Sequence, residues 1–134
     1  MYIVSACLAG LCCRYDGGDN ADERVIGLVR EGLAVPVCPE QLGGLPTPRP
    51  PCEISGDRVM TVNGVDVSAG FLRGAQEALK VAKMIGADKA VLKARSPSCG
   101  AGKVYDGTFS GRLVDGDGFF AAMLKAEGIE VETE

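Results

Sequence analysis

Residues 89–100, with the sequence KAVLKARSPSCG, join a short apolar run to a cysteine in a turn-rich segment. The run Ala90-Val91-Leu92 is typical of a buried strand, and we expect that strand to cover Lys89 to Lys93. The segment Ser96-Pro97-Ser98-Cys99-Gly100 has the composition of a tight turn or loop. The sequence therefore predicts a thiol, that of Cys99, just beyond the end of a buried strand.

Two further cysteines occupy the same position relative to apolar runs of their own. Cys7 follows Tyr2-Ile3-Val4, and Cys38 follows Leu33-Ala34-Val35-Pro36-Val37. In a parallel sheet the carboxyl ends of neighbouring strands meet at one edge, which is where such sheets bind ligands. We therefore expect Cys7, Cys38 and Cys99 to converge at that edge.

Strands and helices alternate along the chain, which favours an α/β fold with a mainly parallel sheet. We expect a single domain spanning residues 1–134, with flanking helices and about four strands in the order two-one-three-four. The third strand is the one described above. The other expected strands lie at residues 1–6, 34–37 and 129–131. Apolar residues at helical spacing and capping signals predict helices that begin after Asn20, after Ser68 and at Phe119.

Turn signals predict how the remaining segments are built. Asn20 is expected to cap the first helix as part of a capping box. Residues 38–55 are rich in proline and glycine and are expected to form a long irregular loop. Residues 58–62 and 65–67, on either side of Asn63-Gly64, are typical of a β-hairpin.

Charge and hydropathy exclude several classes of partner. The chain has 134 residues, a net charge of −4 and no basic block. Binding to a nucleic-acid backbone needs clustered lysines and arginines, so nucleic acid is not an expected partner. Neither a membrane-spanning run nor a signal peptide is recognisable. We therefore expect a cytoplasmic protein whose six cysteines are reduced.

The absence of histidine narrows the chemistry further. It excludes Ser–His and Cys–His couples and histidine-ligated zinc. Three converging thiolates could hold a cubane iron–sulfur cluster that leaves one iron without a protein ligand, or a zinc ion with one open position. Alternatively, each cysteine is simply a small buried residue near a loop, as cysteines often are.

The other three cysteines are given secondary roles. Cys12 and Cys13 are adjacent in sequence and are expected nearer the outside of their loop, where they serve packing or form an unwanted disulfide. Cys52 lies in the proline-rich segment and could approach the site as a fourth metal ligand. Such a ligand would close the open iron position.

Several polar residues are candidates for acid–base work or for ligand binding. Glu40 is two residues beyond Cys38, and a carboxylate among apolar groups can serve as an acid or base. Ser96 could donate a hydrogen bond at the same edge, or it could be only a turn residue. Arg14-Tyr15-Asp16 could orient a polar planar ligand, with the guanidinium providing a fork of donors, or could only stabilise the loop.

The motifs resemble one family in order and over essentially the whole chain. It is the small bacterial family, long called a domain of unknown function, that includes the thiouracil desulfidases. The matching motifs are SACLAG at residues 5–10, RYDG at 14–17, VCPE at 37–40, GGL at 43–45, PRP at 48–50 and SPSCG at 96–100.

This resemblance implies a [4Fe-4S] cluster held by three cysteines, which match Cys7, Cys38 and Cys99. It implies an enzyme that removes sulfur from a small thiocarbonyl compound such as a thiolated pyrimidine. The fourth iron takes the substrate sulfur, and water supplies oxygen without net redox change. The acidic residue and the serine that assist in the family match Glu40 and Ser96, and Asp16 is a second acid–base candidate.

Other functions are left open by the residues themselves. One is a non-catalytic module that binds zinc, or an iron–sulfur cluster closed by Cys52. Another is a thiol redox protein that uses Cys12 and Cys13. The last is a scaffold without a cofactor, in which the cysteines only pack.

Overall fold

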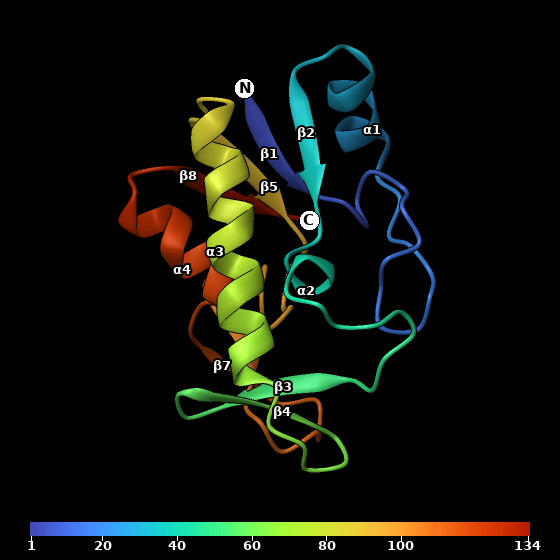
Figure 1. The fold of residues 1–134 in the computed structure, drawn as a ribbon, viewed down its shortest axis with the longest axis vertical. Coiled ribbons are helices and arrows are strands. Elements are labelled where there is room, and N and C mark those ends of the chain that lie inside the picture. Colours follow the sequence, from blue (N-terminus) through green and yellow to red (C-terminus); the bar gives the residue numbers. More distant parts are fainter.

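A four-stranded sheet forms the centre of the computed structural model, which describes residues 1–134 (Figure 1). The strands have the order β2-β1-β5-β8, and each neighbouring pair is parallel. They are β1 (Tyr2–Ser5), β2 (Ala34–Val37), β5 (Lys89–Leu92) and β8 (Glu130–Thr133). This arrangement confirms the predicted α/β class, the parallel sheet and the strand order.

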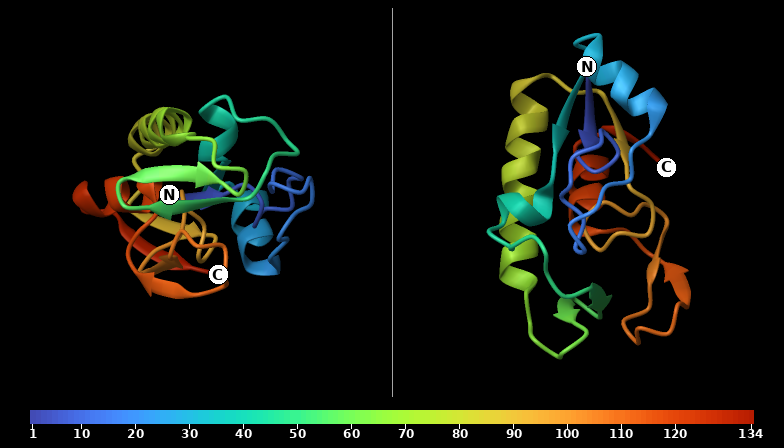
Figure 2. Two further views of the ribbon diagram at one scale, coloured as in Figure 1. Left: turned by 90° about the horizontal axis from the view of Figure 1, so that it is seen from below. Right: turned by 90° about the vertical axis from the view of Figure 1, so that its right-hand side faces the viewer.

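Helices cover both faces of the sheet (Figure 2). They are α1 (Glu23–Arg30), α2 (Pro39–Leu42), α3 (Ser68–Met84) and α4 (Phe119–Ala126). Successive side chains of a strand point to opposite faces. Ile3 and Leu92 accordingly belong to the core formed with α3 and α4, whereas Val4 and Val91 pack with Val25 of α1. No helix combines the length and the apolar character needed to cross a bilayer.

Two antiparallel strand pairs lie beyond the carboxyl ends of the parallel strands (Figure 1). They consist of β3 (Cys52–Ser55) with β4 (Arg58–Thr61), and β6 (Lys103–Tyr105) with β7 (Leu113–Asp115). Glu53 of β3 connects them, because its Oε1 accepts hydrogen bonds from the backbone N–H groups of Gly107 and Phe109 at 3.0 and 3.1 Å. The two strand pairs therefore lie opposite the carboxyl ends of the parallel strands.

The proline-rich segment is more regular than the sequence predicted. Residues 38–55 contain both α2 and β3, so the expectation of one long irregular loop is wrong. A further hairpin was not predicted, since residues 58–61 pair with residues 52–55 across the two-residue turn Gly56-Asp57. The predicted pairing of β4 with residues 65–67 is present in a short form: an antiparallel bridge joins Met60 to Asp66, and backbone hydrogen bonds run from Thr61 N to Val65 O at 2.8 Å and from Val67 N to Val59 O at 2.9 Å. The Asn63-Gly64 signal marks a turn, but the stronger partner strand lies on the other side.

Two predicted helix caps are also different in the structure. Asp22, and not Asn20, caps α1, because its Oδ1 accepts from Val25 N at 3.1 Å. Asn20 binds Arg14 instead, at 2.8 Å. Ser68 is the first residue of α3, and its Oγ accepts from Val59 N of β4 at 2.8 Å. Asn20 therefore stabilises its own loop, and Ser68 joins α3 to β4.

The strand that leads to Cys38 lies at an edge of the sheet. The carbonyls of Leu33 and Val37 accept from Tyr2 and Ala6, so the odd-numbered residues of β2 face β1. Pro36 therefore faces outward, where its missing N–H breaks no hydrogen bond of the sheet. This placement explains how a proline is accommodated next to Val37 and Cys38.

Glycines allow α2 to approach α3 closely. A Cβ at Gly43 would overlap the carbonyl oxygen of Gly70, and a Cβ at Gly74 would overlap that of Pro39. The two helices therefore touch through their backbones. Because α2 begins directly after Cys38, this contact fixes the position of Cys38 relative to the core.

Replacing Gly74 with alanine tests that contact. Although alanine favours a helix over glycine by about 1 kcal/mol, its Cβ here would meet Pro39. We expect Gly74→Ala to lower the free energy of unfolding, measured in urea, by roughly 1–3 kcal/mol, as overpacking does. In the matched control Gly27→Ala, a Cβ meets nothing within 4 Å, so this variant should be neutral or stabilised. Similar effects of the two substitutions would contradict close helix packing.

Candidate active site

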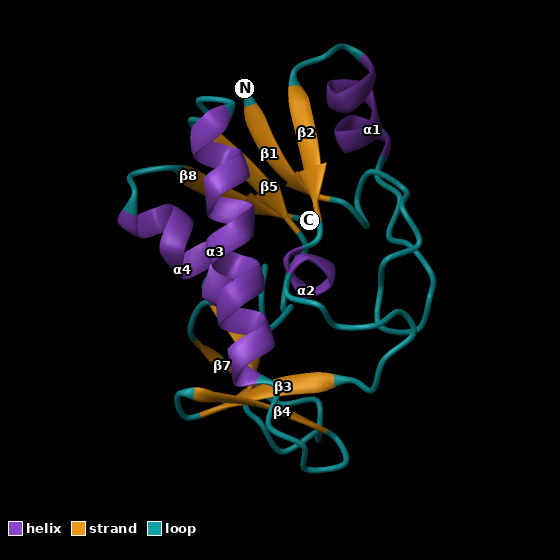
Figure 3. Ribbon diagram, in the orientation of Figure 1, coloured by secondary structure: helices purple, strands orange, loops and turns teal.

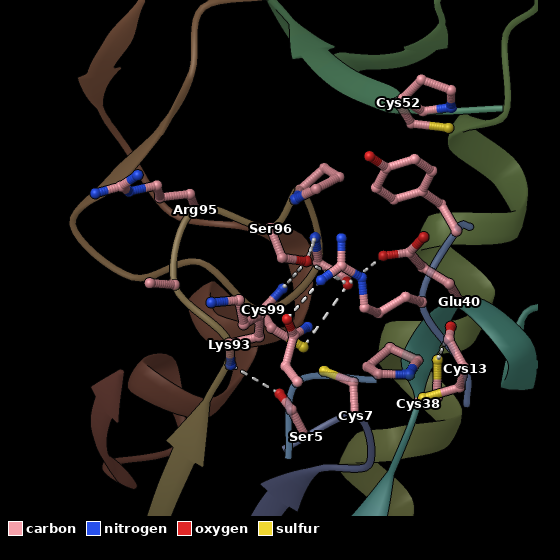
Figure 4. Close-up of a pocket in the computed structure, with 18 of the residues that line it drawn as sticks. Ser5, Cys7, Cys13, Cys38, Glu40, Cys52, Lys93, Arg95, Ser96 and Cys99 are labelled. Atoms are coloured by element: carbon pink, nitrogen blue, oxygen red, sulfur yellow. Dashed lines mark hydrogen bonds between the residues drawn. The ribbon is translucent and has the colours of Figure 1, made fainter. Parts of the chain in front are cut away.

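A pocket of about 760 Å³ opens where the parallel strands end (Figure 4). The carboxyl ends of β1, β2 and β5 supply one side, and β3 with Tyr105 and Phe109 supplies another. Pockets that take small organic ligands have volumes of roughly 300–1,000 Å³. The loops after β1 and α2 run side by side next to this pocket (Figure 3), where Arg49 N donates to Tyr15 O at 2.7 Å.

Cys7, Cys38 and Cys99 all line this pocket (Figure 4). Cys7 lies just beyond β1, and Cys38 is the N-cap residue between β2 and α2. Cys99 is buried in the loop that follows β5. The structure therefore brings together the three thiols that the strand ends predicted, from segments far apart in sequence.

Cys13 is a fourth thiol of the pocket, which the sequence analysis did not anticipate. It is buried, whereas its neighbour Cys12 is exposed, so the expectation that both lie on the outside of their loop is wrong for Cys13. The Cys38 thiol donates to the Cys13 carbonyl oxygen at 3.9 Å. That carbonyl is also held by Arg49, a residue of a distant segment, so no local pattern could have placed Cys13.

Hydrogen bonds among the thiols separate their pKa values. The neighbouring Cys13 thiol lowers the pKa of Cys7 to about 6 and that of Cys38 to about 7, because its hydrogen can be donated to either sulfur, although to only one at a time. Hydrogen bonds to Cys38 and Cys7 raise the pKa of Cys13, which therefore stays protonated. Burial raises the pKa of Cys99 to about 12. The lowered pKa values of Cys7 and Cys38 favour the thiolate, which is the form that binds metals.

Arg49 connects the segments that carry these groups. Its side chain is 5% exposed, and its Nε donates to Glu40 Oε1 at 2.9 Å. Its Nη2 donates to the Cys13 carbonyl oxygen at 2.9 Å, and its Nη1 donates to Thr47 Oγ1 and Pro46 O. A buried guanidinium is tolerated only when its donors are satisfied in this way. Glu40 is therefore held in a fixed orientation at the pocket.

Ser96 and Ser98 link the Cys99 loop to Glu40. Ser96 Oγ accepts from the backbone N–H groups of Ser98 and Cys99, each at 3.1 Å, and so stabilises the turn. Ser98 Oγ donates to Glu40 Oε2 at 3.0 Å and lies 3.1 Å from Ser96 Oγ. Ser98 was not singled out from the sequence, because its carboxylate partner is 58 residues away. Ser98 nevertheless belongs to the site, because it lines the pocket and binds Glu40.

The remaining candidates divide between the pocket and its surroundings. Asp16 does not line the pocket; its Oδ1 accepts from Gly18 N at 3.0 Å and pairs with Arg14 Nε at 3.2 Å. Arg14 and Tyr15 line the pocket's rim. Cys52 lines the pocket on its β3 side, away from the other thiols, and its thiol donates to Pro50 O at 3.4 Å (Figure 4).

The donors of the pocket suit an iron–sulfur cluster. No three cysteine, aspartate or glutamate side chains are spaced to hold a single metal ion. A cubane has a different requirement, because each of its irons takes one thiolate. Soft thiolates are the ligands that such clusters prefer, and the pocket offers two thiols with lowered pKa values and the buried thiol of Cys99. Binding at Cys99 would require release of its proton.

Comparisons with known proteins agree over the full length of the chain. A family model described as 2-thiouracil desulfurase matches residues 2–134. The protein YbbK of Bacillus subtilis (strain 168), described as uncharacterized, is 44% identical over 144 residues, which cover 100% of this chain and 95% of YbbK. A solved structure of the [4Fe-4S]-dependent thiouracil desulfidase TudS (DUF523Vcz) is 47% identical with a TM-score of 0.94; the match covers 99% of this chain and 89% of that one.

Substituting Arg49 tests its role as the connection between segments. Arg49→Gln removes the cation from a pair whose side chains are 5% and 14% exposed. Breaking a buried ion pair on one side costs about 3–5 kcal/mol, and we expect a loss near the lower end in urea denaturation of the metal-free protein.

Arg58→Gln is the matched control for this measurement. The Arg58–Asp66 pair is 63% and 42% exposed, and such surface pairs contribute about 1 kcal/mol or less. If the two variants lost the same stability, Arg49 would not be a buried connection.

Proposed function

Because the chain belongs to the 2-thiouracil desulfurase family, we propose that residues 1–134 form one domain that acts as a [4Fe-4S]-dependent desulfidase. Its substrate is a thiolated pyrimidine or a similar small thiocarbonyl compound. The observation that carries this proposal is the single pocket that gathers Cys7, Cys38 and Cys99 beside Glu40 and Ser96. The likeness to TudS, described as [4Fe-4S]-dependent, supports the same cofactor.

We assign the cluster to the thiolates of Cys7, Cys38 and Cys99. When bound by three protein ligands, the cluster supplies an iron that is free to act as a Lewis acid for soft sulfur. The lowered pKa values of Cys7 and Cys38 favour the ligating form of both thiols. Lys93 lines the pocket and contributes to the lowered pKa of Cys7.

The residues of the chain supply the remaining parts of the reaction. Exchange of sulfur for oxygen consumes one water and releases one sulfide, without transfer of electrons. The water must lose a proton as it adds to carbon, and Glu40 and Ser96 are the pocket groups to which we assign this proton transfer. Arg49 orients Glu40 for this task. Tyr105 and Phe109 line the pocket and offer aromatic surface to a planar ring.

Cys13 supports one alternative function. As a fourth thiol next to Cys7 and Cys38, it could complete the coordination of a cluster and leave no iron for substrate. The protein would then be a non-catalytic iron–sulfur module. Cys13→Ser distinguishes the two functions, because an enzyme with three ligands keeps its iron, whereas a closed cluster loses one ligand.

Anaerobic reconstitution with iron and sulfide tests the cofactor. We expect a brown protein with about four irons and four sulfides per chain, as for a cubane cluster. Cys38→Ser should lose most of this iron, whereas Cys12→Ser, whose thiol is exposed, should keep it. Colourless wild-type protein after reconstitution would argue against the assignment.

The reaction is tested with thiouracil and the reconstituted protein. Conversion to uracil should be visible as loss of thiocarbonyl absorbance together with released sulfide. Cys99→Ala should abolish turnover because one of the assigned cluster ligands is lost. Full activity of Cys99→Ala would exclude Cys99 from the ligand set.

A further inference from the structure

Both oxygens of the Glu40 carboxylate are oriented by partners within the chain. Arg49 occupies Oε1 at 2.9 Å, and the Ser98 hydroxyl occupies Oε2 at 3.0 Å. Glu40 also has no direct hydrogen bond to Ser96, although both were assigned to the same proton transfer. Any exchange between the two therefore depends on the group that lies between them, which is Ser98.

The hydrogen bonds of Ser96 determine the direction of this connection. A serine hydroxyl has one hydrogen to donate and two lone pairs that accept. Both lone pairs of Ser96 Oγ are taken by the backbone N–H groups of Ser98 and Cys99, at 3.1 Å each. Its only remaining capacity is to donate, and its partner is Ser98 Oγ at 3.1 Å.

Ser98 completes the chain in the same direction. Its single hydrogen lies between the Glu40 carboxylate at 3.0 Å and the Cys99 sulfur at 3.7 Å. The shorter contact to a charged acceptor is the stronger one. Ser98 is 1% exposed, so water does not compete for this hydrogen. The hydrogen bonds thus run from Ser96 to Ser98 to Glu40, whose far oxygen is held by Arg49.

We propose that Ser98 is a positioning residue that orients Glu40 for proton transfer and links it to Ser96, an inference that rests on the proposed desulfidase function. As water adds to the thiocarbonyl carbon, its proton passes to a remaining lone pair of the Glu40 carboxylate, which Ser98 and Arg49 hold in orientation. Water loses one proton, Glu40 gains one, each serine is unchanged, and no electrons move.

Steady-state kinetics of the cluster-loaded protein test this connection. General acid–base groups contribute roughly 10²–10⁴-fold to rate, so we expect Ser98→Ala to lower kcat about 10²-fold with little change in KM. Ser98→Thr, which keeps the hydroxyl, should recover most of the rate. Ser55→Ala, an exposed serine outside the pocket, is the matched control and should behave like wild type.

A double-mutant cycle keeps the test decisive even if Ser98→Thr packs poorly. If Ser98 acts only through Glu40, the variant with both Ser98→Ala and Glu40→Gln should be no slower than Glu40→Gln alone. Iron counts and melting temperatures must match wild type in each variant. Multiplying losses in kcat, or a loss confined to KM or to iron content, would overturn the proposal.

Proton NMR of the metal-free protein gives a readout that does not depend on activity. A buried hydroxyl hydrogen bound to a carboxylate exchanges slowly, so a signal should be present in wild type, absent in Ser98→Ala and shifted in Glu40→Gln. A signal unaffected by Glu40→Gln would overturn the link. The expected signals in a cluster-loaded protein without desulfidase activity would overturn the proposed function and leave the hydrogen-bonded chain intact, so the two failures are distinguishable.

Discussion

The parallel pairing of three strands in register is the constraint on which the site depends. Tyr2 of β1 pairs with Ala34 of β2 and with Lys89 of β5, so the three strands begin and end at nearly the same level. The Ser5 hydroxyl extends this alignment past the strand ends by accepting from Lys93 N at 2.9 Å. The segments that follow the three strands all contribute residues to the same pocket. A shift of register by one residue would turn the core side chains to the opposite face.

A chain without histidine has to organise acid–base chemistry by other means. Here a single guanidinium binds both the carboxylate of Glu40 and the backbone beside Cys13, and two serines connect that carboxylate to the loop of Cys99. The network joins the Cys13, Glu40 and Cys99 segments of the pocket through hydrogen bonds of the chain itself. Burial makes such contacts strong when complete and costly when one partner is missing. The chain's own side chains and backbone therefore orient the polar groups of the site.

The fold was largely predictable, because apolar runs and helical spacing are local properties. The sheet order, Phe119 as the start of α4 and the gathering of Cys7, Cys38 and Cys99 in one pocket follow from them. The predictions that failed concerned residues whose hydrogen-bond partners the local sequence pattern does not indicate. The cap of α1, the burial of Cys13 and the importance of Ser98 depend on contacts with Arg14, Arg49 and Glu40. In residues 52–67 the turn at Asn63-Gly64 and the short pairing across it were predicted, whereas the pairing of β4 with β3 was not.

Pro36 has a consequence for how copies of the protein behave in concentrated solution. It faces the open side of β2, where an unprotected strand would offer a row of donors and acceptors to another chain. Because Pro36 has no N–H, the outer edge of β2 cannot form a continuous set of strand hydrogen bonds with a neighbouring molecule. The strand that delivers Cys38 is thereby kept at the sheet's margin without becoming a seed for aggregation.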